Sequence, residues 1–309
     1  MRRWTAVALL TLIASTASTA STNFEDAIAA YKRGDFSLAV RGLRAAANEG
    51  HPDAPYILGF IFSSDEGIAA DYLEAVKWFR TAAKQGDAEA QYNLGLLYEN
   101  GRGVPANLNK ALRWYRRAAE QGNADAQYNL GVMFGNGNGV SVDDRVALKW
   151  FRLSAKQGHA SAQGRLGTVY ALGKGVAASD DKALEWFRLG ADQGDANAQY
   201  NLSNFYTLGR GIPVNEGEAV NWLRLAAEQG HAAAQDRMGS IYGLGWGVPA
   251  DHAVAAKWYR MAAKQGLGNA QANLGIMYVM GNGVTVNYAE ALKWLRAAAK
   301  QNNSNAQYT

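Results

Sequence analysis

Two amphipathic patterns alternate along the chain, and both have the period of an α-helix. In the stretch 87–122, the first pattern places its apolar residues at i, i+4, i+7 and i+8 of one helical face, at Ala90, Leu94, Leu97 and Tyr98. The second pattern forms a similar face from Ala111, Trp114, Ala118 and Ala119. Gly101 and Gly103 separate the two patterns and permit a turn. The pattern therefore predicts a pair of helices.

The pair recurs with a fixed period. Tryptophan stands at 78, 114, 150, 186, 222, 258 and 294, so that every interval is 36 residues. Aligning the chain on these residues gives seven units without insertion or deletion: 51–86, 87–122, 123–158, 159–194, 195–230, 231–266 and 267–302. A fixed period of this length indicates a repeat array in which neighbouring helix pairs bury a shared core.

Residue types at fixed positions of the repeat predict how the helices end and pack. Asp87, Asn123 and Asp195 stand where an N-cap is needed, and so do His51, His159 and His231. Glycine at 95, 131 and 167 lies inside the first helix, where it costs roughly 1 kcal/mol relative to alanine. We expect these glycines to let the Trp of the second helix lie against the first.

Both ends of the chain differ from the repeats. Residues 1–20 have the layout of a secretory signal peptide: Arg2 and Arg3, an apolar stretch, then small residues that favour cleavage after Ala17 or Ala20. We expect export, to the periplasm or as a secreted protein. Residues 23–50 predict a shorter cap repeat, and 303–309 copy the start of a further, incomplete repeat, as a degenerate cap or a truncation.

Composition narrows the chemistry. The chain has no Cys, which excludes a disulfide scaffold, a thiolate metal site and a thiol nucleophile. Without Arg2 and Arg3, the 31 basic side chains become 29 against 27 acidic ones, too weak a balance to indicate nucleic acid. We expect no metal, no cofactor, no membrane span and a monomer.

Motifs that imitate active sites have structural explanations. The glycine-rich stretches at 135–139 and 173–175 lack the Gly-Lys-Ser/Thr of a phosphate loop and recur as connections between helices. The pairs Asp143-Asp144 and Asp180-Asp181 precede second helices, where carboxylates favour the helix dipole. We expect capping at these positions rather than catalysis.

The 36-residue unit resembles a known family. Its Ala-x-x-x-Leu-Gly-x-x-Tyr-x-x-Gly-x-Gly-Val half and its Ala-x-x-Trp-x-x-x-Ala-Ala half, as in 87–122, are similar to the Sel1-like repeat, a relative of the tetratricopeptide repeat. The resemblance covers 51–302, and 23–50 resembles a tetratricopeptide-type cap. It implies an all-α fold, a right-handed α/α superhelical solenoid of antiparallel helix pairs. It also implies an adaptor: exported bacterial members include regulators of sensor kinases, envelope assembly factors and secreted host-interaction proteins.

The resemblance to tetratricopeptide arrays also implies that the first helices line a concave groove, where solenoids bind partners. The positions beside the core face of these helices become the candidate contacts: Tyr56, Tyr92, Leu96, Tyr128, Val132, Arg165, Thr168, Tyr200, Asn204, Arg237 and Ser240. Tyr and Arg are enriched at binding hot spots. The alternative is that the tyrosines only pack between neighbouring first helices. Trp246, in a connection, is either a further contact or packs over the adjacent repeat.

These observations favour a non-enzymatic adaptor or regulator of the bacterial cell envelope that binds a protein or peptide in its groove. Two other classes stay open. One is an envelope protein that recognises peptidoglycan or polysaccharide. The other is a hydrolase of β-lactams or peptidoglycan, since a cysteine-rich branch of the family is linked to penicillin binding; this chain has none of those cysteines.

Overall fold

The computed structural model describes residues 19–64 and 67–306 of the 309-residue chain. Most of the predicted signal peptide, residues 1–18, and the end of the predicted incomplete repeat, residues 307–309, lie outside this range. The described residues form sixteen helices and no strand. The all-α prediction is therefore confirmed. Within the described part, no helix is both long and apolar enough to cross a membrane.

The helices alternate as the repeat predicts. The region before the first repeat holds α2 (Thr19–Lys32) and α3 (Phe36–Asn48). The first helices of the seven repeats are α4 (Ala54–Ser63), α6 (Ala88–Asn100), α8 (Ala124–Asn136), α10 (Ala160–Leu172), α12 (Ala196–Leu208), α14 (Ala232–Leu244) and α16 (Gly268–Met280). The second helices are α5 (Tyr72–Lys84), α7 (Leu108–Glu120), α9 (Asp144–Lys156), α11 (Asp180–Asp192), α13 (Glu216–Glu228), α15 (His252–Lys264) and α17 (Tyr288–Ala306).

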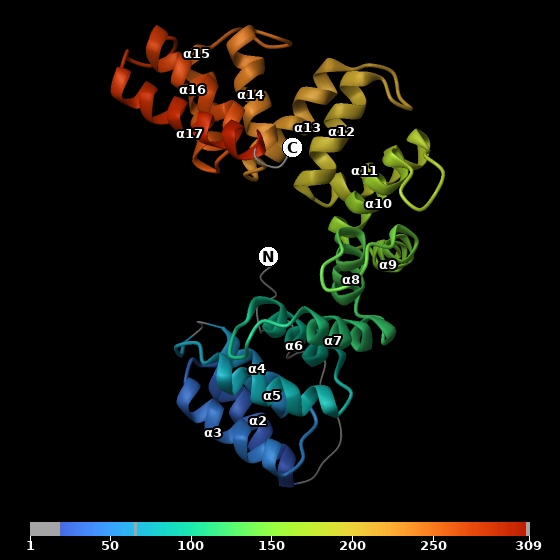
Figure 1. Ribbon diagram of the computed structural model, residues 1–309. Helices are drawn as coiled ribbons and strands as arrows, with labels where there is room; N and C mark the ends of the chain where they lie inside the picture. Colours follow the sequence, from blue (N-terminus) through green and yellow to red (C-terminus); the bar gives the residue numbers. More distant parts are fainter. Residues whose placement is uncertain (1–18, 65–66, 307–309) are drawn as a thin grey trace. The chain divides into compact units, whose positions relative to one another are not determined.

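The chain forms two compact units, and the boundary between them in the sequence falls within α9, between Trp150 and Phe151. In the first unit, α2 packs on α3, α4 on α5 and α6 on α7, and each second helix also packs on the next first helix (Figure 1). The second unit repeats this arrangement from α10 to α17. α5, α7, α11, α13 and α15 thus each contact two first helices, which confirms that neighbouring pairs stack within each unit.

Side-chain and glycine caps fix the helix ends. Asp87 Oδ1 accepts a hydrogen bond from the Ala90 amide at 2.6 Å, and α6 ends at Gly101 in the left-handed conformation, with φ 66°. The second glycine of the connection, Gly103, lies so close to the start of α5 that a Cβ there would be 2.1 Å from the Tyr72 carbonyl oxygen. The glycine-rich stretches therefore end helices and let the connections pack closely on the neighbouring helix, as expected for structural connections.

The glycines inside the first helices leave space for a different side chain of the second helix from the one that we expected. A Cβ on Gly95 would lie 2.6 Å from the ring of Tyr115, the residue after Trp114. Gly59 has the same relation to Phe79, and Tyr115 and Phe79 are almost completely buried. Our expectation that the Trp itself lies against these glycines is therefore wrong.

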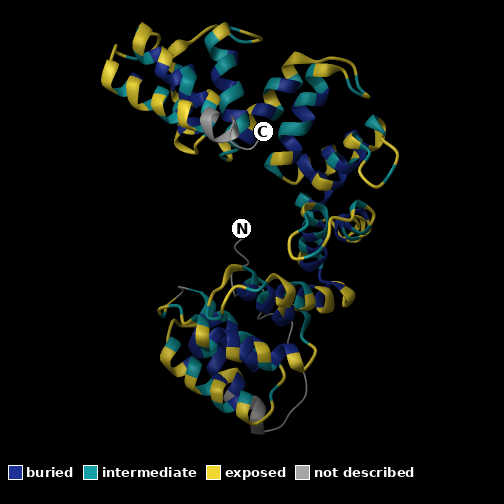
Figure 2. Ribbon diagram, viewed as in Figure 1, coloured by how far each residue is buried: buried dark blue, intermediate teal, exposed yellow. Residues whose placement is uncertain are grey.

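Trp114 instead is half-buried at the side of the core, with the Arg117 guanidinium carbon 4.7 Å from its ring centroid. One residue along a helix turns the side chain by about 100°, and this rotation separates the two roles. Figure 2 shows buried residues on the helices of both units.

A row of buried glutamines links the repeats. Gln163 Nε2 donates to the Ala155 carbonyl oxygen of the preceding second helix at 3.3 Å, and Gln163 Oε1 accepts from Gln193 Nε2 at 2.6 Å. The same pairs recur at Gln91, Gln199, Gln235 and Gln271. Each of these glutamines satisfies a buried carbonyl and fixes the spacing of three helices.

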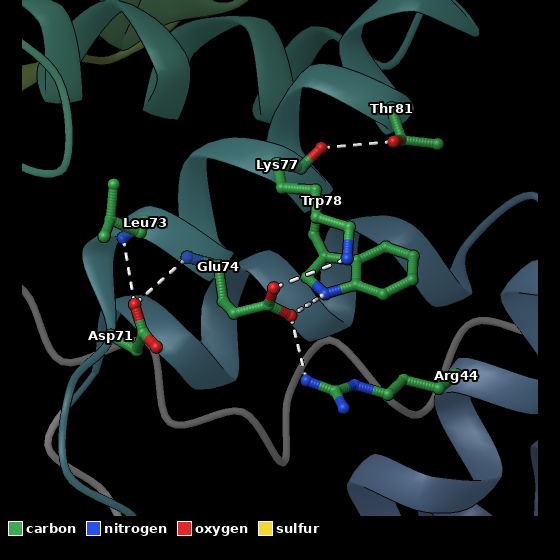
Figure 3. A network of polar contacts seen from close by, with 7 residues as sticks. All are labelled: Arg44, Asp71, Leu73, Glu74, Lys77, Trp78 and Thr81. Carbon is green, nitrogen blue, oxygen red and sulfur yellow. Dashed lines mark hydrogen bonds and ion pairs between the residues drawn. The ribbon is translucent and has the colours of Figure 1, made fainter.

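An acidic side chain joins the N-terminal helices to the first repeat (Figure 3). Glu74 on α5 accepts hydrogen bonds from Trp78 Nε1 at 3.0 Å and from Arg44 on α3 at 2.9 Å. Burial alone raises the pKa of Glu74, but the bonds from Trp78 and Lys77 outweigh it and hold the pKa below its usual value. Arg44 and Lys77 are both exposed, so their ion pairs with Glu74 contribute little to the free energy of folding. The role of the network is to link α3 to α5.

Candidate partner-binding surface

Three tyrosines occupy equivalent positions on consecutive first helices of the first unit. Tyr56 on α4, Tyr92 on α6 and Tyr128 on α8 are each half-buried. The ring of Tyr56 lies 5.9 Å from that of Phe79, and the ring of Tyr92 lies 5.8 Å from that of Tyr115. These two tyrosines therefore pack on the second helix of their own repeat and are partly exposed.

Carboxylates lie near Tyr56 and Tyr92, among them carboxylates of the next repeat. Burial raises the pKa of Tyr56, and the negative charges of Glu89 and Asp87, at the start of α6, raise it further. For Tyr92, the pKa is raised first by burial and then by Asp125, Glu89 and Glu99. Tyr56 and Tyr92 thus lie beside the acidic N-terminal turn of the next first helix.

Local hydrogen bonds hold two of these carboxylates in place. Glu89 Oε1 accepts from Asn123 Nδ2, the N-cap of α8, at 2.7 Å, which ties neighbouring first helices together. Glu99 Oε2 accepts from the Tyr115 hydroxyl at 2.5 Å. Partial burial of its carboxyl raises the pKa of Glu89, and the charges of Asp125 and Asp87 add to this rise although Asn123 opposes it.

Burial also raises the pKa of Asp87, and the charge of Asp53 contributes, although the hydrogen bond from Ala90 opposes the rise. Leu96 and Val132, both half-buried, lie one helical turn from the tyrosines. We call this surface the tyrosine–carboxylate face; it consists of Tyr56, Tyr92, Tyr128, Leu96, Val132, Asp53, Asp87, Glu89, Glu99 and Asp125.

The equivalent positions of the second unit are polar and largely bonded to one another. Arg237 on α14 donates to Asn204 Oδ1 on α12 and, at 3.3 Å, to Thr207 Oγ1. Ser240 Oγ lies 3.0 Å from the Tyr259 hydroxyl oxygen. The structure therefore brings the predicted Asn204 and Arg237 together as a bridge between repeats.

The other predicted residues of this unit lie apart from that bridge. Thr168 Oγ1 donates to the Gly164 carbonyl oxygen of its own helix at 3.1 Å, and Arg165 is exposed. The Tyr200 ring stacks on His231, with the ring centroids 4.6 Å apart.

An exposed apolar row in the second unit escaped the sequence analysis. The last residues of α10, α12, α14 and α16 are exposed: Leu172, Leu208, Leu244 and Met280. Trp246, two residues beyond Leu244, is 37% exposed. These residues repeat every 36 residues, and this spacing is a signal that the sequence contains. The predicted groove positions lie one helical turn earlier on the same helices.

The histidines and the paired aspartates act mainly as structural groups. Nδ1 of His159 and of His231 accepts from the amide three residues on at 3.1 Å, which confirms both as N-caps. Asp143 caps α9, but Asp180 does not cap α11; it pairs with Arg210, while Ser179 is the cap.

His51 accepts from the Asp53 amide at 3.3 Å and stacks on Phe24, so it is not a cap. Within the described residues, no group of three or more His, Cys, Asp or Glu side chains could hold a metal ion.

Comparison with known proteins identifies the repeat. The Sel1 repeat model matches residues 52–87, 88–123, 124–159, 160–195, 196–231, 232–267 and 268–303. The search of the curated proteins found no match.

Two solved structures are similar over nearly the whole chain. One is c5321, a protective antigen present in uropathogenic Escherichia coli strains that displays an SLR fold; it is 33% identical, with a TM-score of 0.74, and the match covers 93% of this chain. This chain spans 63% of the length of that protein. The other is a Sel1 repeat protein from Oxalobacter formigenes, 36% identical, with a TM-score of 0.74 and coverage of 94% of this chain and 86% of that one. The chain belongs to the Sel1 repeat family.

Proposed function

We propose that the chain is a non-enzymatic adaptor or regulator of the bacterial cell envelope that binds a protein or peptide along the tyrosine–carboxylate face. Sel1 repeat solenoids generally serve as protein-interaction scaffolds, and this supports binding as the activity. The family alone does not select a partner or a surface. The surface is argued from the residues of this chain.

One observation carries the proposal: Tyr56, Tyr92 and Tyr128 recur at one position of three consecutive first helices, and each stays partly exposed. The rings of Tyr56 and Tyr92 pack on the second helix of their own repeat, so they lose little side-chain entropy when a partner covers them. Half-buried tyrosines of this kind combine apolar area with a polar hydroxyl, which favours them as contact residues.

Export is part of the proposal. The first twenty residues have the layout of a signal peptide, and the E. coli relative is a protective antigen, which fits a protein that leaves the cytoplasm. Fractionation of cells that produce a C-terminally tagged chain tests this point. A tagged product that keeps its first twenty residues and stays in the cytoplasm would contradict export.

Chemical cross-linking in the native host, followed by mass spectrometry, tests binding. The wild-type chain is compared with the double variant Tyr92→Leu/Tyr128→Leu, which keeps apolar packing in the core. The control is Tyr288→Leu, since Tyr288 is exposed at the start of α17 and lies outside the face. We expect a protein partner that is lost from the double variant and retained by the control.

Capture of the same partner by all three chains would refute the proposed surface. Retention on purified cell wall, with no protein partner captured, would favour recognition of peptidoglycan or polysaccharide instead.

A further inference from the structure

The charges of the first unit are segregated between its first and second helices. From α4 to α8, the first helices contain no Lys or Arg, while α6 and α8 contain Glu89, Glu99 and Asp125, and Asp53 and Asp87 precede α4 and α6. The second helices carry the cations: Lys77, Arg80 and Lys84 on α5, and Lys110, Arg113, Arg116 and Arg117 on α7. The tyrosine–carboxylate face is therefore anionic in a chain whose net charge is positive.

Aromatic rings and carboxylates alternate along this face. Tyr56 lies in the field of Asp87 and Glu89, and Tyr92 in the field of Glu89 and Asp125. Glu89 and Asp125 occupy the same position of successive repeats, and both are exposed. A cation placed between a carboxylate and the face of a tyrosine ring is attracted by both.

The chain itself contains one half of such a contact, a lysine over the ring of a tyrosine. Lys110 Nζ lies 5.2 Å from the ring centroid of Tyr98. In the second unit, by contrast, the residues equivalent to Glu89 are Ser161, Asn197, Ala233 and Asn269, and Arg165 and Arg237 bring positive charge. The first helices of the second unit therefore lack the net negative charge of those in the first unit, since Asp195 and Asp236 are balanced by Arg165 and Arg237.

The repeat also sets a spacing. First helices that contact each other, as α4 and α6 do, lie roughly 10 Å apart. A peptide in the extended polyproline II conformation rises about 3.1 Å per residue with three residues per turn, so one helix-to-helix step corresponds to about three residues and every third side chain points to the same side. A ligand that places one cation on each step therefore carries Lys or Arg at every third position.

We propose that the tyrosine–carboxylate face binds an extended segment of a partner protein that carries Lys or Arg about every third residue. This inference rests on the proposed function and specifies the chemistry of the partner. The charged groups lie over Glu89 and Asp125, and the apolar stems of the side chains lie on Tyr56 and Tyr92.

Fluorescence anisotropy with labelled peptides tests the proposal on the full chain. The probes are four Lys-Leu-Ser triplets, the same triplets with Glu or with Gln in place of Lys, and a peptide of the same composition with its four Lys residues adjacent. We expect the Lys triplet peptide to bind most tightly, and its affinity to fall as salt is added. Clustering the Lys residues is expected to weaken binding several-fold.

Two double variants then locate the contact. Glu89→Gln/Asp125→Asn removes two carboxylates, while the side-chain amide introduced by Glu89→Gln still offers an oxygen to Asn123. The control Glu49→Gln/Glu120→Gln makes the same charge change at exposed residues at the ends of α3 and α7 that lie outside the face. We expect the first variant to bind the Lys triplet peptide about fivefold to tenfold more weakly, and the control to bind as the wild type.

Four results would overturn the inference: no binding of the Lys peptide, equal binding of all the peptides, preference for the Glu peptide, or equal weakening in both double variants. The proposed function is judged separately, because cross-linking in the native host, compared between the wild type and Tyr92→Leu/Tyr128→Leu, detects a protein partner whatever its charge. Thermal unfolding of the variants shows whether a loss of binding comes from a loss of fold.

Discussion

A methyl group added at Gly167 is expected to destabilise the chain, against the usual effect of replacing glycine in a helix. Gly167 lies inside α10, and a Cβ at this position would be 2.5 Å from Phe187 Cδ1 and 2.7 Å from Cε1. Phe187 is 1% exposed, so its ring has no free space into which it can move. Either α10 or the ring has to shift.

Two opposing effects set the size of the change. Alanine gains roughly 1 kcal/mol over glycine in a helix interior. Overpacking a close-packed core costs about 1–3 kcal/mol. We therefore expect Gly167→Ala to lower the free energy of unfolding by about 1 kcal/mol, the difference between these effects.

Gly243 provides the matched control in the same unit. A Cβ there would meet only Ala255 Cβ, at the ordinary contact distance of 3.8 Å. Because Gly243 lies next to the last residue of α14, we expect Gly243→Ala to stabilise by about 0.5 kcal/mol. Urea unfolding followed by circular dichroism gives both midpoints. A stabilising effect of both substitutions would refute the packing argument.

Three further predictions concern the frame around the site. Gln163→Leu removes the donor to the Ala155 carbonyl and the acceptor for Gln193, so we expect a loss of about 1–3 kcal/mol in urea unfolding. Burial lowers the pKa of His231, so the unfolded chain binds more protons and stability falls as pH drops through about 6.5. His231→Asn keeps a cap and should remove part of that fall, as measured by melting temperature from pH 8 to pH 5. Leu208→Ser should leave the melting temperature nearly unchanged, because Leu208 is 67% exposed.

The regularity of the repeat explains how much of the fold could be predicted from the sequence. Seven copies without insertions give the helix order, and the caps at Asp87 and His159 follow from local hydrogen bonding. Local signals of this kind do not depend on where neighbouring helices lie. The expectation that a tryptophan packs against Gly95 is wrong because it is based on Trp114, the residue that recurs in every repeat. The ring that fills the space at Gly95 is that of Tyr115.

The side chain that points at the glycine varies among Phe, Tyr and Leu, so the position is less conspicuous than the tryptophan. The repeat also predicts the tyrosine row, but it does not reveal the carboxylates around it. Glu89 and Asp125 lie on the same helices as Tyr92 and Tyr128, yet their effect on a ring crosses from one repeat to the previous one. The position of the next helix decides that contact, and a pattern within one repeat does not contain it.

Site-specific photo-cross-linking in the native host tests whether the tyrosine–carboxylate face binds a protein partner. A photoreactive amino acid is placed at Leu96, on the tyrosine–carboxylate face, or at Arg113, which is exposed on the second helix α7. We expect cross-links to a protein partner from position 96 and few or none from position 113. Cross-links from position 113 alone, or equally from both positions, would contradict it.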